Sequence, residues 1–293
     1  MRIIIVPLLI LVLFGCHSEA DKKTTDTTQQ IAETKTVSTA AIQKDTVSTP
    51  LNPDDTIPNI SIPADAIQVT DDKIDTSFNI HMLWNGEGIE RTPTLSKLQW
   101  KALIYKNKSF YLQDTETKLK RELYPEGTEE VGTMGLFISS IDKNATYLIS
   151  GLNITNRPID TFDVRNKFDV TNKIIYPGQK IKFDYKGTTY IFYATGSKMD
   201  SVKKGYKNYK LFLTANVKGH TFNQLISSMG SYFGSVEDGE ELSYFTIEFV
   251  GDIDGDRIPD IVVTWAAEYY DSRDLYVSSL AGDKAILKHV ATF

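Results

Sequence analysis

The chain has 293 residues, with 32 Lys and Arg against 38 Asp and Glu and a formal net charge of −6. This mildly acidic balance argues against nucleic acid as a partner, because binding to phosphates depends on basic patches. The length is sufficient for one large or two small domains. Cysteine occurs once, at Cys16, so an internal disulfide is excluded.

The first residues predict an export signal. A positive charge at Arg2 precedes an almost unbroken apolar run from Ile3 to Phe14, which ends at Gly15 and Cys16. As a helix this run would extend about 18 Å, well short of the roughly 30 Å hydrocarbon core of a bilayer. Residues 1–15 are therefore expected to be a signal peptide and not a membrane span.

The end of this run resembles the bacterial lipobox, which has leucine three residues before an invariant cysteine and a small residue directly before it. Leu13, Gly15 and Cys16 fit this pattern, while Phe14 is bulkier than the family usually has. The resemblance implies cleavage before Cys16 and acylation of that cysteine by lipids such as palmitate. Two or more acyl chains give stable anchoring, so we expect membrane attachment through lipidated Cys16.

The residues after Cys16 indicate a location and a tether. Glu19 and Asp21 resemble the acidic signal that sends some Bacteroidetes lipoproteins to the cell surface, so we expect the outer membrane or the cell surface. Residues 16–62 contain no aromatic residue and are rich in Thr, Ser, Asp, Lys and Pro. Such a composition predicts a disordered linker after the lipidated cysteine. The β-rich globular domain is expected over residues 63–293.

Alternating apolar residues predict strands in this domain. Ile181, Phe183 and Tyr185 are followed by Lys186-Gly187 and the run 189–194, which together indicate a β-hairpin. The preceding Tyr176-Pro177-Gly178 has the Pro-Gly order of a type II turn. Further strands are expected over residues 101–105, 110–113, 134–140, 145–150 and 209–215.

One α-helix is predicted over residues 221–230. Thr221 and Gln224 form a capping box, and Gly230 is suited to ending the helix. The apolar residues recur at helical spacing, at Phe222, Leu225, Ile226 and Met229. The expected fold class is therefore α+β, mainly antiparallel β, in a single globular domain after a disordered tether.

A run of aspartates separates two further strands. Phe245, Ile247 and Phe249 alternate with polar residues, and Ile261, Val263 and Trp265 alternate with Val262 and Thr264, so each strand is expected to bury one face. The loop between them, residues 252–260, has carboxylates at its positions 1, 3, 5 and 9: Asp252, Asp254, Asp256 and Asp260. Four like charges in nine residues repel one another unless a cation lies among them.

Calcium is the cation that this loop predicts, in a structural role. Calcium accepts 6 to 8 oxygens at about 2.3–2.6 Å in loose geometry, whereas magnesium demands octahedral geometry and zinc prefers nitrogen or sulfur. The expected ligands are the side chains of Asp252, Asp254, Asp256 and Asp260 and the backbone carbonyl of Ile258.

The loop resembles the calcium loop of FG-GAP and VCBS-type repeats, whose pattern is Asp-x-Asp/Asn-Gly-Asp-Gly-x-x-Asp between two strands. The four aspartates and Gly255 match this pattern, and Arg257 departs from it where the family has its second glycine. The family usually repeats such loops through several propeller blades, and here there is one copy. The resemblance therefore implies the ion-binding loop and not the propeller.

Other chemistry is not indicated. The four histidines, His17, His81, His220 and His289, are far apart in the sequence and belong to no metal or nucleophile motif. No phosphate-binding glycine loop occurs, so no catalytic or cofactor-binding residue is predicted. The acidic runs 129–130 and 237–241 are interpreted as exposed turns. Tyr269, Tyr270 and Tyr276 either stack on a sugar or peptide or fill the second face of the sheet.

Three hypotheses of function remain open. The first, which we prefer, is a non-enzymatic envelope or surface lipoprotein whose calcium-stabilised domain binds a glycan or a protein. The second is a calcium-stabilised hydrolase acting on polysaccharide or peptidoglycan, and the third is a structural envelope component without a small ligand. A concave pocket with convergent carboxylates would favour the hydrolase, and a flat aromatic patch beside the loop would favour the binding protein.

Overall fold

The computed structural model describes residues 55–56, 58, 60–89, 92–124, 132–162, 164, 174–198, 206–231, 244–267 and 270–293. All of them belong to the compact unit Pro50–Phe293, one of two units into which the chain divides. The expected signal peptide, Cys16 and most of the expected linker lie outside these residues. In the described part of the chain no helix is long and apolar enough to cross a membrane.

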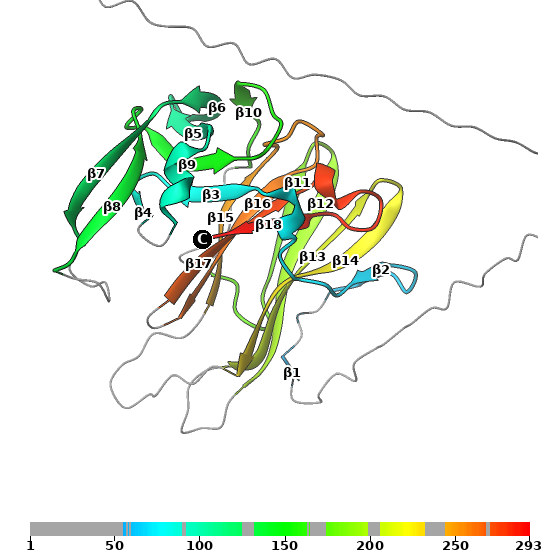
Figure 1. Ribbon diagram of the computed structural model, residues 1–293. Helices are drawn as coiled ribbons and strands as arrows, with labels where there is room; N and C mark the ends of the chain where they lie inside the picture. The colour runs from blue at the N-terminus through cyan, green and yellow to red at the C-terminus, as the bar shows by residue number, and fades with distance from the viewer. Residues whose placement is uncertain are drawn as a thin grey trace, which may run out of the picture. The chain divides into compact units, whose positions relative to one another are not determined.

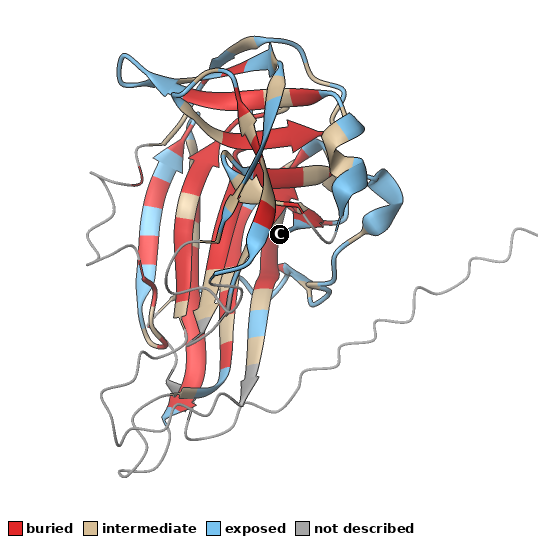
Figure 2. Ribbon diagram, turned by 60° about the vertical axis from the view of Figure 1, so that its left-hand side comes forward, coloured by how far each residue is buried: buried red, intermediate tan, exposed pale blue. Residues whose placement is uncertain are grey.

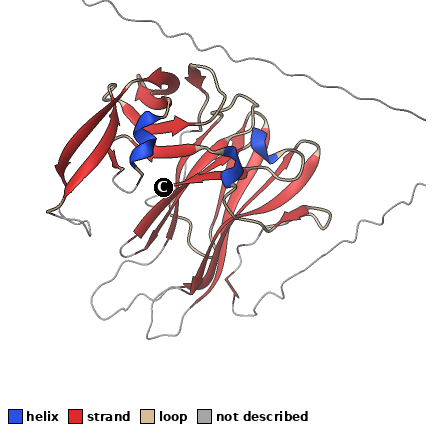
Figure 3. Cartoon of the chain, viewed as in Figure 1, coloured by secondary structure: helices blue, strands red, loops and turns tan. Residues whose placement is uncertain are grey.

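The described elements are β-strands and three short 3₁₀-helices (Figures 1 and 3). The strands are β1 (Asp55–Thr56), β2 (Ile67–Val69), β3 (His81–Trp84), β4 (Glu87–Gly88), β5 (Trp100–Lys106), β6 (Ser109–Thr115), β7 (Thr117–Leu123), β8 (Met134–Ser140), β9 (Ala145–Ser150), β10 (Arg157–Ile159), β11 (Lys180–Tyr185), β12 (Thr188–Lys198), β13 (Tyr206–Val217), β14 (His220–Ser231), β15 (Tyr244–Gly251), β16 (Asp260–Ala267), β17 (Tyr270–Val277) and β18 (Lys288–Thr292). The helices are η1 (Thr76–Phe78), η2 (Pro93–Lys97) and η5 (Ser279–Ala281). The runs predicted as strands from the sequence all lie within strands.

The described strands form four sheets. A large sheet has the order β1-β12-β13-β14-β2, with β11 also paired to β12, and a five-stranded sheet has the order β10-β6-β5-β9-β3. A central sheet contains β15-β16-β17-β18, and a three-stranded sheet contains β4-β8-β7. All pairings are antiparallel except that of β14 with β2, which confirms the mainly antiparallel β architecture. Strand β1 lies inside the stretch for which the sequence predicts the linker, and it pairs with residues 196–197 of β12.

The predicted hairpin and turn are confirmed. Tyr185 pairs with Thr188, and Lys186 and Gly187 between them have φ values of 49° and 85°. Positive φ at both central residues is the turn whose twist matches that of the flanking strands. In the turn before the hairpin, Gln179 N donates to Tyr176 O at 2.9 Å and Gly178 has a φ of 87°, as a type II turn requires.

The α-helix predicted over residues 221–230 is wrong, because these residues form strand β14. A second two-residue turn at Lys218-Gly219, with φ values of 53° and 79°, pairs Val217 with His220 and starts a long hairpin with β13. A register shift in this hairpin, between Leu211 and Phe212 of β13, changes the alternation of β14. Both Phe222 and Met229 therefore pack on the same core although their spacing is helical. Within the described residues, the helical part of the α+β expectation is thus reduced to the three 3₁₀-helices and the single α-helical residue Val164.

The central sheet is buried on both faces. Ile261 and Val263 of β16 belong to a core that includes the large sheet, whereas Val262 between them belongs to a second core that includes the five-stranded sheet. The expectation of one buried face on this strand is therefore wrong, because another sheet covers the second face (Figure 2). A third core joins the other face of the five-stranded sheet, at Leu148, to Ile138 of the three-stranded sheet.

Candidate metal centre

The aspartate loop connects the first two strands of the central sheet. Strand β15 ends at Gly251, which pairs with Asp260 at the start of β16. Inside the loop, Asp252 accepts hydrogen bonds from Gly255 N at 2.6 Å and Arg257 N at 3.3 Å. Asp254 accepts from Asp256 N at 3.2 Å, and Asp256 accepts from Ile258 N at 2.7 Å. Alternate aspartates thus curl the loop by binding backbone N–H groups further along it.

Two loop positions require left-handed backbone. Gly255 has a φ of 96°, and a Cβ there would overlap the guanidinium of Arg157. Arg257 has a φ of 74°, which is uncommon for any residue with a Cβ. This is the position where the resemblance to FG-GAP loops would place a second glycine. The departure therefore strains the backbone and leaves the carboxylate positions as they are.

Asp260 joins the loop to the segment that follows β17. Its Oδ2 accepts from Ile253 N at 2.6 Å and from Asp254 N at 3.2 Å. Its Oδ1 accepts from Ser278 N at 2.8 Å and from Ser278 Oγ at 3.0 Å. Asp260 and Ser278 both have 0% exposure, so this junction is excluded from water.

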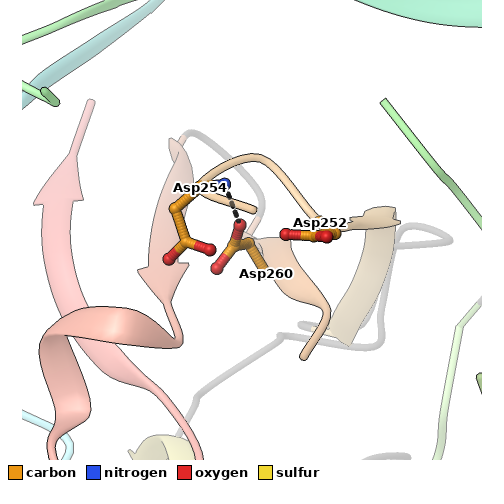
Figure 4. A group of neighbouring side chains, drawn as sticks. All are labelled: Asp252, Asp254 and Asp260. Atoms are coloured by element: carbon orange, nitrogen blue, oxygen red, sulfur yellow. Dashed lines mark hydrogen bonds between the residues drawn. The ribbon is translucent and has the colours of Figure 1, made fainter. Parts of the chain in front are cut away.

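The expected ligand residues converge. One carboxylate oxygen each from Asp252, Asp254 and Asp260 lies within 4.8 Å of the others, a group able to hold a metal ion (Figure 4). Asp256 and Ile258 belong to the same cluster, because Ser278 Oγ lies 3.0 Å from Asp256 Oδ1 and 3.2 Å from the carbonyl oxygen of Ile258. Three of the five expected ligand residues, Asp252, Asp254 and Asp260, thus form a group that could hold a metal ion, and the roles of Asp256 and Ile258 as ligands stay predictions.

Burial makes the charges in this cluster unfavourable. Burial raises the pKa of Asp260 well above its ordinary value, and the charge of Asp254 raises it further, although hydrogen bonds from Ser278 and Ile253 oppose the shift. The pKa of Asp256 is also raised, first by burial and then by Asp254. A cation among these oxygens would remove both penalties.

Two contributors to the site come from outside the loop and were not predicted. Arg157 of β10 donates from Nη2 to Asp252 O at 2.7 Å and to Asp252 Oδ1 at 3.4 Å. Among the described residues this is the cation that pairs with the aspartate cluster. Ser278 is the second. Neither residue could be predicted from the sequence, because both are distant from the loop along the chain and only the pairing of the strands brings them to it.

The donor set fits a hard cation. The groups able to bind a metal are all oxygens, from carboxylates, a carbonyl and a hydroxyl, and the described part of the site includes no histidine. Oxygen donors favour calcium, magnesium or manganese over zinc or copper. The cluster is buried on one side, since Asp252 is 7% exposed and Asp260 is fully buried, whereas Asp254, Asp256 and Ile258 are half-buried.

The tyrosine interpretation is resolved for one residue. Tyr276 is 1% exposed, its hydroxyl donates to Ile226 O at 2.5 Å, and its ring stacks on His289. Tyr276 therefore packs in the core on one face of the sheet and does not stack on a sugar or peptide. Tyr269 and the side chain of Tyr270 lie outside the described residues, as do the acidic runs 129–130 and 237–241.

The described histidines do not meet at the metal centre. His289 is buried against Asp274, with Nε2 3.4 Å from Asp274 Oδ1 and 2.9 Å from Thr292 Oγ1, and its Nδ1 lies 3.0 Å from Asp72 O. Burial lowers its pKa, but the hydrogen bond and charge of Asp274, with two backbone carbonyls, outweigh burial and raise the pKa overall. This pair fastens β18 to β17 and belongs to the framework.

One open hollow of about 810 Å³ lies away from the loop, at the ends of β6 and β8. Its carboxylates include Asp114, whose pKa is lowered by hydrogen bonds from Lys101 and Asn156, and Asp142, which accepts from Asn144 at 2.9 Å. An ionised carboxylate held by a lysine does not supply the protonated group that a general acid requires.

Comparison of this chain with family models, with curated proteins and with solved structures gives no match.

Proposed function

We propose that this protein is a lipid-anchored envelope or cell-surface protein whose β-rich domain is stabilised by one calcium ion and binds a ligand outside the cell. The observation that carries the proposal is the convergence of carboxylate oxygens from Asp252, Asp254 and Asp260, with Asp256 and the carbonyl of Ile258 close to the same serine, Ser278. The anchor is proposed from the lipobox resemblance at Cys16.

Calcium is favoured over other hard cations by the origin of the donors. The oxygens come from an irregular loop and from a second segment of the chain, and they include side-chain and backbone groups. Calcium tolerates such irregular shells, whereas magnesium keeps most of its waters and its octahedron. The millimolar calcium found outside cells also suits the modest affinity of exported calcium modules, about 10⁻⁴–10⁻³ M.

The role proposed for the ion is structural. Asp252 and Asp260 are buried and Asp254 and Asp256 are half-buried, and all four carboxylates already accept hydrogen bonds from the protein. The contacts of the cluster reach β10 through Arg157 and the segment after β17 through Ser278. An ion here would therefore fix strands of two sheets relative to one another, as closed metal sites do.

The hydrolase alternative has one observation in its favour. Burial raises the pKa of Glu87, against the opposing charge of Arg273, and general acids of hydrolases are carboxyls whose pKa is raised by burial. The carboxylate that raises it further, Asp271, is held by Arg273 at 2.6 Å. Structural ion pairs perturb neighbouring carboxyls in the same way, so this single raised pKa does not carry an enzyme and the binding function is preferred.

Calorimetric titration with calcium and with magnesium tests the metal, and a glycan array with a hydrolase screen tests the ligand. We expect calcium binding in the range of about 10⁻⁴–10⁻³ M and weaker magnesium binding. Absence of calcium binding by the folded protein would exclude the calcium site. Hydrolysis of a polysaccharide that is lost in Glu87→Gln would replace the binding hypothesis with the enzyme.

A further inference from the structure

Ser278 has a side-chain environment that its own hydrogen bonding does not explain. Its Oγ is fully buried and lies close to four acceptor oxygens, at 3.0 Å from Asp256 Oδ1, 3.0 Å from Asp260 Oδ1, 3.2 Å from Ile258 O and 3.4 Å from Asp254 Oδ2. These four residues are the third, fifth, seventh and ninth of the loop. Ser278 itself follows β17 and comes from another part of the chain.

Ser278 Oγ has only one proton for its four neighbouring acceptor oxygens, so three of these contacts lack a hydrogen bond. A hydroxyl carries one proton and donates one hydrogen bond, so with the carboxylates ionised the other three contacts bring oxygen lone pairs against oxygen lone pairs. Most of the facing oxygens are carboxylate oxygens, and Ser278 and Asp260 are fully buried, so water screens their repulsion poorly. A cation in contact with all five oxygens would turn each of these repulsive contacts into one between neighbouring ligands.

The separations agree with this arrangement. Two oxygens that are each about 2.4 Å from a calcium ion, and about 75–90° apart as seen from it, are about 2.9–3.4 Å from each other. The contacts of Ser278 Oγ, from 3.0 to 3.4 Å, fall in this range. Hydrogen bonds from Lys218 Nζ to Ser278 O at 3.2 Å and Gly282 O at 2.7 Å hold the segment in place.

We propose that Ser278 Oγ is a direct ligand of the ion, in addition to the five residues of the loop. This inference rests on the proposed calcium site and adds to it a ligand from outside the loop. The hydroxyl keeps its proton and binds the ion through a lone pair. The consequence is that the ion connects the β15–β16 loop to the end of β17, so that metal binding stabilises two connections of the central sheet.

The test compares the full-length wild type with Ser278→Ala and with the neighbouring Ser279→Ala. Ser279 is the control because its side chain is exposed. Its backbone N–H donates to Asp254 Oδ2 at 3.0 Å, and the alanine variant keeps this hydrogen bond. Calcium affinity is measured by calorimetry. Bound terbium, which replaces calcium, reports the number of coordinated O–H bonds through its luminescence decay in H₂O and D₂O.

We expect Ser278→Ala to bind calcium roughly tenfold more weakly, comparable to the loss of a close support of a metal site, and Ser279→Ala to bind as the wild type does. The number of coordinated O–H bonds should rise in Ser278→Ala, because a water with two such bonds replaces a hydroxyl with one. Ser278→Cys is nearly isosteric and replaces the oxygen by soft sulfur, so it gives the same result where alanine disturbs folding.

The two failures are distinguishable. A wild type that binds neither calcium nor terbium overturns the proposed function together with this inference. A wild type that binds, with Ser278→Ala and Ser278→Cys unchanged in affinity and in O–H count, overturns the serine ligand and leaves the calcium site intact. If Ser278→Ala lowers the melting temperature but leaves the calcium affinity and the number of coordinated O–H bonds unchanged, the serine has only a hydrogen-bonding role. That result also overturns the inference.

Discussion

Thermal unfolding with and without calcium measures the contribution of the proposed calcium site to stability. With about 2 mM calcium and a dissociation constant of about 10⁻⁴ M, the folded state gains about 1.8 kcal/mol by mass action. For a folded unit of roughly 150–250 residues this free energy raises the melting temperature by about 4–7 °C. Magnesium at the same concentration should raise it less, because it gives up its waters reluctantly.

The decisive variant is Asp254→Ala combined with Asp256→Ala, which should abolish the calcium shift. The metal-free protein experiences two opposing effects. The two carboxylates accept hydrogen bonds from the loop, from Ser279 N and from Ser278 Oγ, each contributing about 0.5–1.5 kcal/mol. Their removal also ends the repulsion that they exert on buried Asp260. The metal-free melting temperature should therefore change less than these hydrogen bonds alone would suggest.

The matched control is Asp65→Ala combined with Asp283→Ala, which removes the same charge at two exposed positions. The control should keep the full calcium shift, measured by differential scanning calorimetry. An undiminished shift in the loop variant would refute the reasoning, because the ion would then lie elsewhere and the loop would be an acidic turn.

Four further predictions follow from single features. The pKa of His289 in the folded protein is raised above its ordinary 6.5, so protonation of this residue stabilises the fold. This stabilisation is complete below pH 6.5 and is lost as the pH rises through the raised pKa. The loss is about 1.4 kcal/mol for each pH unit that separates the folded from the unfolded pKa. Urea unfolding across this range should show the loss in wild type and not in His289→Gln. Arg257→Gly should stabilise the protein by up to about 1 kcal/mol, since a residue with a Cβ in the left-handed region costs about 1–2 kcal/mol and the entropy of glycine offsets part of this; lower stability would mean that the arginine side chain contributes contacts. Cys16→Ser should abolish fatty-acid labelling, and equal labelling of both proteins would refute the lipobox assignment. Limited proteolysis should cut first between residues 17 and about 62, and first cuts confined to the region beyond residue 78 would contradict this boundary.

Local sequence was sufficient where the determining contacts are local. The alternation of Ile181, Phe183 and Tyr185 and the Lys186-Gly187 turn specified a hairpin, because a two-residue turn with positive φ matches the twist of its strands. The loop 252–260 could be predicted as a loop between two strands for the same reason. Its aspartates accept hydrogen bonds from backbone N–H groups two to five residues further along the chain.

The tertiary structure decided what depends on distant partners. Residues 221–230 have helical spacing and a capping box, yet pairing with β13 and a register shift make them a strand, since tertiary pairing outweighs weak local preference. Burial of Val262 required a second sheet on the far face of β16. Arg157 and Ser278 reach the metal centre only because β10 and β17 lie beside the loop, and spacing along the chain carries no trace of such contacts.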